Sequence, residues 1–386
     1  MILFWHLYAI LIIFFLLFGL AASLINFFTV RRFDQYPPAK EYPFVSVLVP
    51  ARNEEQSIKI CISSLLAQDY PDFEVIVLND NSTDDTASIL EQLACCDNRL
   101  QVIQGTPLPD GWLGKHWACH QLYQSAKGEL FLFTDADTRY TPDMLRTSVS
   151  ALIAEHADLV SAFPYEEMLT WGERLLVPIM CWGMFTFIPI RLVQKMHLAL
   201  LAISIGQFML FRRAGYELVG GFERVRTEVV DDVCMGRILI SKGGEWRLLD
   251  GTRQITCRMY HGFREAVGGF SKTIFAVFDY RILPYIIGWL LAGLAILGPV
   301  VGLILYLLRV PLTFIPVGFA AISVALSIIT WIITSRRFHF PIYIAFIYPL
   351  DLALYIIVAA HSFIRTATGT AVWKNRVLDR VPMRWL

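Results

Sequence analysis

Long apolar segments near both ends of the chain constrain its fold more than any other feature. Residues Ile2–Val30 are almost uninterrupted apolar sequence, and Leu283–Leu308, Leu312–Thr334 and Ile342–Ile364 follow near the other end. About 20 apolar residues suffice for a helix to cross a bilayer. Over 386 residues the chain is 56% hydrophobic and only 17% charged, which is too apolar for an ordinary soluble protein. The sequence therefore predicts membrane helices joined to a globular domain.

The basic residues predict how the chain is oriented in the membrane. No basic segment precedes the first apolar stretch, whereas Arg31 and Arg32 follow it directly, so it is an anchor and not a cleaved signal peptide. The N-terminus is then outside and the globular domain cytoplasmic. The basic tail, residues 365–386, should also stay inside, which conflicts with three further spans. Pro349 and Asp351 interrupt the last apolar segment, and we predict that this segment does not cross.

Changes in composition divide the chain into six parts. They are an N-terminal transmembrane anchor (1–30), a proline-rich linker (31–43), a globular domain (44–260) with a membrane-associated insertion (175–205), an interfacial amphipathic helix (261–280) interrupted by Gly268 and Gly269, C-terminal transmembrane segments (281–364) and a basic tail (365–386).

The globular domain alternates short apolar runs with helical patterns. Strands are expected at Phe44–Val49, Phe73–Leu78, Leu100–Ile103 and Leu130–Phe133, and helices at Glu55–Ala67, Thr86–Leu93, Trp117–Ser125 and from Thr141 and Pro142 onward. Alternating strands and helices predict an α/β fold with a doubly wound, mostly parallel sheet. Such sheets bind ligands at the carboxyl ends of their strands.

Three polar clusters occur at such strand ends: Pro50–Glu54, Asn79–Asp84 and Asp135–Asp137. A magnesium-type ion takes one or two carboxylates and lets substrate phosphates complete its shell. Each cluster also has a purely structural explanation, because Asp and Thr favour turns and Ser82–Asp85 reads as a capping box. Three acidic clusters at one edge of a sheet suit a metal-bound diphosphate and a ribose better than a bare anion.

Other candidate sites are weaker. His116 and His120 have a spacing that could hold zinc, but no second ligand pair exists, and His116 could instead line a nucleotide pocket. The seven cysteines form no Cys-x-x-Cys pair and are expected to be reduced thiols. The net charge of zero gives no indication of nucleic-acid binding.

These stretches resemble the family 2 glycosyltransferases, whose A-type nucleotide-diphospho-sugar transferase fold is then implied. The matching segments are Val47–Glu55, Asn79–Thr86, Asp135–Asp137 and Val230–Asp232. The resemblance narrows to the membrane-bound, lipid-modifying branch of carotenoid, hopanoid-associated and ceramide glycosyltransferases, and is closest to the bacterial carotenoid enzymes, including the diaponeurosporenoate type. Its segments are Gly111–Lys115, Gly206–Arg213, Gly220–Phe222, Arg258–Tyr260, Gly269–Lys272 and Trp373–Arg376.

The resemblance implies a role for each matched residue. Pro50, Ala51 and Glu54 shape the nucleoside pocket, Asp80 binds the base or ribose, Lys115 lies near the phosphates, and Asp135 touches the ribose or sugar. Asp137 coordinates the metal, Mg²⁺ or Mn²⁺. Asp232 is the general base, and Asp231 stands where Glu is usual. On the acceptor or phosphate side are Gln207, Arg258, Arg264, Lys272, Trp373 and Arg376.

The implied activity is an inverting, metal-dependent transfer of one sugar from a nucleotide-diphospho-sugar, with UDP-glucose expected, to an apolar lipid such as a carotenoid or hopanoid at the bacterial plasma membrane. A single transfer is expected because the Gln-x-x-Arg-Trp signature of processive synthases is absent. One alternative is a polyprenyl-phosphate glycosyltransferase, which Arg212, Arg213 and Lys272 leave open. Another is a non-catalytic scaffold or transporter subunit.

Overall fold

The computed structural model describes residues 2–310, 316–370, 372–373, 376–377 and 382–386, which form two compact units. The first, here the sheet unit, comprises Val30–Glu167 and Ile190–Met259. The second, here the helical unit, comprises the described residues of 1–29, 168–189 and 260–386. The residues predicted as a linker, 31–43, belong to the sheet unit.

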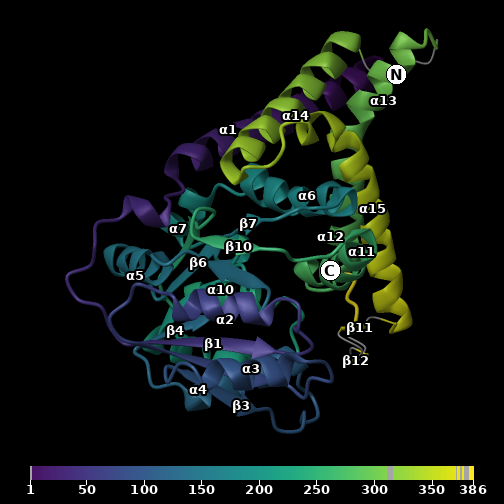
Figure 1. Ribbon diagram of the computed structural model, residues 1–386. Helices are drawn as coiled ribbons and strands as arrows, with labels where there is room; N and C mark the ends of the chain where they lie inside the picture. Colours follow the sequence, from purple (N-terminus) through teal and green to yellow (C-terminus); the bar gives the residue numbers. More distant parts are fainter. Residues whose placement is uncertain (1, 311–315, 371, 374–375, 378–381) are drawn as a thin grey trace. The chain divides into compact units, whose positions relative to one another are not determined.

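A seven-stranded mixed sheet organises the sheet unit (Figure 1). In spatial order its strands are β3 (Leu100–Gln104), β2 (Phe73–Asn79), β1 (Val45–Ala51), β4 (Leu130–Phe133), β8 (Met209–Arg212), β6 (Leu159–Phe163) and β9 (Trp246–Asp250). All pairs are parallel except those that β8 makes with β4 and β6. The prediction of a doubly wound, mostly parallel sheet is confirmed.

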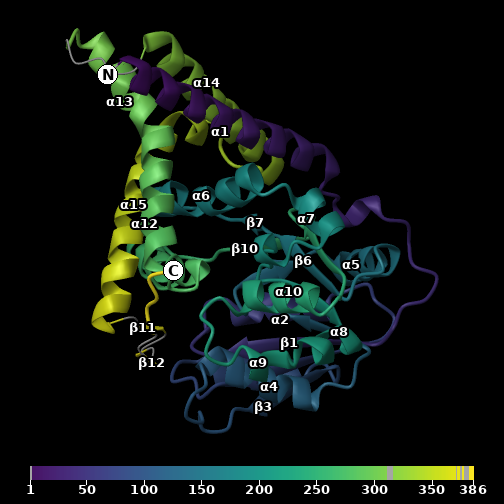
Figure 2. The ribbon, with the colours of Figure 1, turned by 180° about the vertical axis from the view of Figure 1, so that it is seen from behind.

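Alternating side chains give the sheet two apolar faces, and helices cover both. Val45, Val47 and Val49 share a buried cluster with the apolar side chains of α2 (Ile58–Leu66), α3 (Thr86–Ala94) and α5 (Met144–Ala154). On the other face, Phe131 and Phe133 meet rings from α4 (Gly114–Ser125), α8 (Arg213–Val219) and α9 (Gly221–Arg224). Figure 2 shows α4 and α9 on this second face.

A small second sheet extends the loop after β4. Its strands are β5 (Thr138–Tyr140), β10 (Ile255–Cys257) and β7 (Tyr165–Glu166), with β10 in the centre. The sequence did not predict β5, and the helix expected from Thr141 and Pro142 begins at Met144 instead. Three residues are too short for a strand pattern to be recognised, and β5 forms only because β10 pairs with it from far along the chain.

Most other predicted bounds in this region are confirmed within one or two residues. The main corrections are at helix starts: α2 begins at Ile58, not at Glu55, and α4 begins at Gly114, not at Trp117. Asp231 and Asp232 open a further helix, α10 (Asp231–Ser241). A short helix, α7 (Ile190–Met196), opens the second segment of the sheet unit.

The helical unit contains four helices long and apolar enough to cross a membrane, counted over the described residues. They are His6–Thr29 within α1 (Ile2–Thr29), Ile282–Leu307, α14 (Val317–Phe338) and α15 (Ile344–Thr368). The second consists of α12 (Ile282–Ala292), a π-helical turn (Gly293–Leu297) and α13 (Gly298–Leu307). A fifth candidate arises if α6 (Trp171–Phe187) and α7 count as one broken span. Both views show α1 lying along α14 (Figures 1 and 2).

Buried polar side chains hold the helical unit together. The Asn26 amide on α1 donates hydrogen bonds to the carbonyls of Phe185 and Ile188, at 2.8 and 2.7 Å, where α6 ends and its last carbonyls lack helical partners. Asp351 of α15 is 0% exposed. An acid in an apolar helix is tolerated when protein surrounds it, and this is where α15 places it.

The stretch predicted as an interrupted amphipathic helix is α11 (Phe263–Thr273), which continues through both glycines. The interruption was wrong, and the two glycines differ in their surroundings. A Cβ atom at Gly269 would collide with the Tyr260 ring, whereas nothing lies within 4 Å of one at Gly268. Gly269 therefore permits close packing and does not end the helix.

Candidate functional site

The acidic loop after β4 lies where the strand order brings three elements of the sheet unit together. Asp135 and Asp137 follow β4, which pairs with β1 on one side and β8 on the other. Because β8 is antiparallel to β4, the residues before β8, Gly206 and Gln207, lie at the same edge. The Thr134 hydroxyl donates to the Gln207 carbonyl at 3.0 Å, which ties this edge together.

Lys115 joins the loop to helix α4. Its Nζ atom lies 2.5 Å from Oδ1 of Asp135, and both side chains are about a quarter exposed. Burial alone would lower the pKa of Lys115, but the carboxylates of Asp135 and Asp231 raise it above its ordinary value. The ammonium is therefore a permanent positive charge in an acidic site. This agrees with its predicted place near phosphates, a role that stays a prediction.

The acidic pair at the start of α10 contributes two different carboxylates. Asp232 is partly buried and accepts hydrogen bonds from the backbone N–H groups of Gly206 and Val233, each at 2.8 Å. Asp231 is buried, and its Oδ1 lies 3.4 Å from Nε2 of His116. Both acids lie in the first turn of α10, and the burial of Asp231 shows that this helix start is not simply a solvated one.

The environments of these two acids shift their pKa values in opposite directions. Burial and the charge of Asp231 raise the pKa of Asp232 to about 7. Burial would also raise the pKa of Asp231, but the charge and hydrogen bonding of His116 lower it to about 2. Neighbouring acids with separated pKa values are a common arrangement in which one carboxylate handles a proton and the other stays ionised.

Asp232, Lys115 and Gly206 surround one small space. A Cβ atom on Gly206 would lie 3.4 Å from Oδ2 of Asp232 and 3.6 Å from Nζ of Lys115. The absence of a side chain at Gly206 therefore leaves both the carboxylate and the ammonium uncovered on this side. The same Lys115 reaches Asp135, so the structure brings together Asp135, Lys115, Asp231 and Asp232; that they form one functional site stays a prediction.

Asp137 has the surroundings expected of a cation ligand. Burial and the carboxylates of Asp135 and Glu54 raise its pKa to about 7, a sign of excess negative charge that a divalent ion would relieve. Among the described residues no group of three or more His, Cys, Asp or Glu could hold a metal alone. His116 and His120 are thus no zinc site, whereas one or two carboxylates fit an ion that substrate phosphates complete.

The predicted nucleoside side lies at the ends of β1 and β2. The Asp80 backbone N–H donates to the Ala51 carbonyl at 2.8 Å. Nη1 of Arg52 donates to the Asp80 carbonyl at 2.6 Å and lies 3.7 Å from its carboxylate. Pro50 and Ala51 pair with Leu78 and Asn79 across the two strands. These contacts fix Asp80 at the strand edge; its binding role stays a prediction.

Two residues beside Asp137 were missed by the sequence analysis. The Cys257 thiol donates to Oδ1 of Asp137 at 3.6 Å, and Nε2 of Gln207 donates to Cys257 and to Glu166, each at 3.2 Å. Glu166 is buried, and burial raises its pKa to about 8. Glu166 and Cys257 lie in strands of two and three residues, so no local pattern could have identified them.

The remaining predicted residues are distributed over both units. Arg258 follows β10 in the sheet unit, next to Cys257. Arg264 and Lys272 lie on α11 in the helical unit. Trp373 and Arg376 pair through their backbones in the short strands β11 (Val372–Trp373) and β12 (Arg376–Val377), and their neighbours Lys374 and Asn375 lie outside the described residues. Their roles stay predictions.

Comparison with known proteins agrees with this arrangement. Residues 46–220 match glycosyl transferase family 2, a range that includes β1, the Asp135–Asp137 loop and Gly206. The chain is 26% identical over 270 residues to the 4,4'-diaponeurosporenoate glycosyltransferase of Staphylococcus aureus strain MRSA252, covering 66% of this chain and 68% of that protein. The protein of the same name from strain USA300 gives the same identity and coverage.

A solved structure supports the fold. The mannosyltransferase PcManGT of Pyrobaculum calidifontis, in complex with GDP-Man and Mn²⁺, superposes with a TM-score of 0.54 at 18% identity, covering 92% of this chain and 99% of that one. The sheet unit therefore has the A-type glycosyltransferase fold. With this fold and the carboxylate-lined edge, the chain contains a glycosyl transferase family 2 domain over residues 46–220 and is similar to the 4,4'-diaponeurosporenoate glycosyltransferases.

Proposed function

We propose that the protein transfers one sugar from a nucleotide-diphospho-sugar to an apolar lipid, with inversion at the anomeric carbon. The observation that carries this proposal is the convergence of Lys115, Asp135, Asp231 and Asp232 around the space beside Gly206. Such a site offers a cation for phosphates, an acid for the sugar and a base for the acceptor. UDP-glucose is the donor proposed for the first test.

A divalent ion, Mg²⁺ or Mn²⁺, would be held by Asp137, and when bound it neutralises the leaving diphosphate as a Lewis acid. Support comes from the excess negative charge at Asp137 and from the Mn²⁺ bound to the mannosyltransferase of similar fold. Lys115 adds a fixed positive charge on the same edge. Asp135 holds that ammonium in place and presents its second oxygen to the sugar or ribose.

Asp232 removes the proton from the acceptor. Two backbone N–H groups orient its carboxylate, and a pKa of about 7 gives it useful basicity at neutral pH. One base and no separate nucleophile among the proposed roles imply a single displacement. Negative charge from Asp135 and Asp231 also favours the oxocarbenium-like transition state of glycosyl transfer.

The acceptor is proposed to be a carotenoid or another apolar lipid that the protein meets at the bacterial plasma membrane, with the sheet unit in the cytoplasm. Support comes from the four candidate spans and from the name of the Staphylococcus aureus relatives. The sheet unit also exposes apolar side chains in residues 190–201, within the proposed membrane-associated insertion: Leu192, Met196, Leu200 and Leu201 are 47, 58, 73 and 40% exposed. Apolar side chains so exposed are suited to lie against lipid.

Labelled donors test the proposal. Membranes containing the protein are incubated with UDP-[¹⁴C]glucose or GDP-[¹⁴C]mannose and a lipid extract containing carotenoids, and labelled lipids are identified by mass spectrometry. One hexose on an apolar lipid is the expected product. Label in a polyprenyl phosphate would replace the acceptor assignment, and no labelled lipid with either donor would contradict the proposal.

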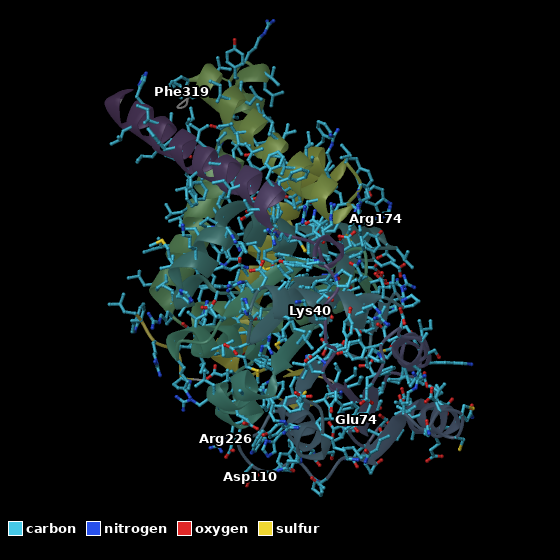
Figure 3. All side chains as sticks on the ribbon, turned by 90° about the vertical axis from the view of Figure 1, so that its left-hand side faces the viewer. Lys40, Glu74, Asp110, Arg174, Arg226 and Phe319 are labelled. Atoms are coloured by element: carbon cyan, nitrogen blue, oxygen red, sulfur yellow. The ribbon has the colours of Figure 1, made fainter. Side chains whose placement is uncertain are left out.

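The matched variants are Asp232→Asn and Asp110→Asn. Asp232→Asn should lower transfer about 10²–10⁴-fold, the usual range for loss of a general base. Asp110 is an exposed carboxylate of the same unit, visible in Figure 3, so Asp110→Asn should transfer at the wild-type rate. Equal loss in both variants would remove Asp232 from its role.

A further inference from the structure

His116 is a buried histidine that lies between two fixed acceptors. Its Nδ1 lies 3.1 Å from the carbonyl oxygen of Arg226, and its Nε2 lies 3.4 Å from Oδ1 of Asp231. The imidazole ring stacks on Phe222 at a centroid distance of 5.8 Å, and the residue is 2% exposed. The same Arg226 carbonyl accepts a hydrogen bond from the backbone N–H of Leu113, just before α4. Figure 3 labels Arg226 and Asp110 at this end of the sheet unit.

The acceptors on both sides assign the protons of this ring. A carbonyl oxygen only accepts hydrogen bonds, so Nδ1 carries a proton. An ionised carboxylate also only accepts, so a favourable contact at Nε2 requires a second proton there. With both protons in place the ring would be an imidazolium facing a buried carboxylate, and each charge would offset the cost of burying the other.

We propose that His116 is a positioning residue for sugar transfer: its imidazolium keeps Asp231 ionised, so that the proton of the acidic pair goes to Asp232. This inference rests on the proposed transfer reaction. Without the cation, two adjacent carboxylates at the start of α10 would share one proton, as closely placed acids do. With it, Asp231 is fixed as an anion and Asp232 alone titrates.

The other charges near the pair do not replace His116. Lys115 lies on the same helix, but its ammonium is 2.5 Å from Asp135 and is held there. Cys119, one turn further along α4, is buried, and burial raises the pKa of its thiol well above the ordinary value, so it stays neutral. The second oxygen of Asp231, Oδ2, is buried and has no hydrogen-bond partner in the described part of the chain. His116 therefore does more than Lys115 to favour the charged form of Asp231.

The first test is the pH dependence of kcat/KM in His116→Gln, with the full-length protein in lipid nanodiscs. Glutamine keeps a donor for Asp231 but has no charge. The acidic limb of the profile should move to higher pH by about one unit, and kcat/KM at pH 7 should fall about fivefold and recover at higher pH. A limb at the wild-type position, even with a lowered rate, would overturn the proposal.

His120→Gln is the matched control. His120 lies one turn further along α4, where its ring contacts Trp112, Trp117 and Gln124 instead of Asp231. The acidic limb of the kcat/KM profile of His120→Gln should stay at the wild-type pH. In Asp231→Asn, by contrast, loss of the adjacent charge should move the acidic limb to lower pH. Adding His116→Gln to this variant should not move the limb further, because His116 affects Asp232 only through Asp231.

A second readout needs no activity. Selective ¹⁵N-histidine labelling identifies the His116 signals by their loss in His116→Gln. At pH 7.5 they should be those of an imidazolium in the wild type and of a neutral ring in Asp231→Asn. A neutral ring in the wild type would overturn the inference even if transfer is confirmed. An imidazolium without any sugar transfer would instead contradict the proposed function.

Discussion

At the scale of single residues, adjacent carboxylates behave differently because their immediate partners differ. Asp231 faces an imidazole, whereas Asp232 faces two backbone N–H groups and the charge of Asp231. The pKa falls to about 2 for the first and rises to about 7 for the second. The sequence identified both acids but could not rank their basicity, because the ranking depends on His116 from a distant helix.

Asp232 sets the predicted pH dependence of transfer. A general base acts only when ionised, and the pKa of Asp232 is raised to about 7, so kcat/KM should fall about tenfold per pH unit below about pH 7 and level off above it. The measurement is a pH–rate profile in nanodiscs from pH 5 to 9. A flat profile across pH 6–8 would contradict this role.

The ionised form of Asp232 should lower the stability of the folded protein. Its folded-state pKa of about 7 exceeds the ordinary 3.8, so its contribution to stability is present below about pH 4 and is lost as the pH rises through 7. Asp232→Asn should therefore raise the melting temperature at pH 8 while lowering transfer as predicted above. A lower melting temperature than wild type at pH 8 would show that the ionised carboxylate stabilises the fold.

Asp137 should control cation binding more than folding. Asp137→Asn removes the charge that we propose holds the ion, so Mn²⁺ binding in the presence of UDP, measured by electron paramagnetic resonance, should weaken at least about tenfold. The Asp110→Asn variant should bind as the wild type does. Chelation of the wild type should abolish transfer without changing its circular dichroism, and added Mg²⁺ or Mn²⁺ should restore it; full activity in chelator would exclude a metal at Asp137.

At the scale of elements, helix α10 positions the acidic pair through close contact behind it. Trp246 of β9 donates to the Ser204 hydroxyl at 3.0 Å, and Gly236 of α10 packs against both. A Cβ atom on Gly236 would lie 2.6 Å from that hydroxyl oxygen and 3.4 Å from the indole nitrogen. The lack of a side chain at Gly236 therefore allows the helix that begins with Asp231 to lie so close.

Gly236→Ala should displace this helix. Overpacking of this kind costs about 1–3 kcal/mol, so the melting temperature should fall, and transfer should fall with it because Asp232 moves. Ser241→Ala, on the exposed end of the same helix, is the control and should be nearly neutral. If Gly236→Ala melts and transfers as the wild type does, α10 can shift without disturbing the site.

The sequence predicted the elements with strong local patterns better than those formed by distant pairing. Buried runs such as Leu130–Phe133 and Phe73–Leu78 were correctly recognised as strands, since their apolar residues are continuous. β5 and β7 were missed because β10, far along the chain, creates them. The sequence motifs located Asp135, Asp137, Asp231 and Asp232. Glu166 and Cys257 could be identified only from the folded structure, where β7 pairs with β10.

At the scale of the whole molecule, the number of membrane crossings determines the side of the C-terminus. All three C-terminal candidates are long and apolar enough to cross. We nevertheless expect the basic tail to remain in the cytoplasm, with α15 not fully crossing, because several arginines follow this helix. Fusions of alkaline phosphatase and of green fluorescent protein after Leu386 test the side of the C-terminus. Fluorescence without phosphatase activity is expected. Phosphatase activity without fluorescence would show an external tail.

The interleaving of the two units along the chain governs how the protein can be made. The ribosome completes β1 to β7, then synthesises residues 168–189 of the other unit, and only afterwards supplies β8, which must enter between β4 and β6. The growing sheet thus lacks the strand between β4 and β6 until after α6 has been synthesised. A chain that ends before Met209 therefore lacks the strand that joins β4 to β6, and its central sheet stays divided.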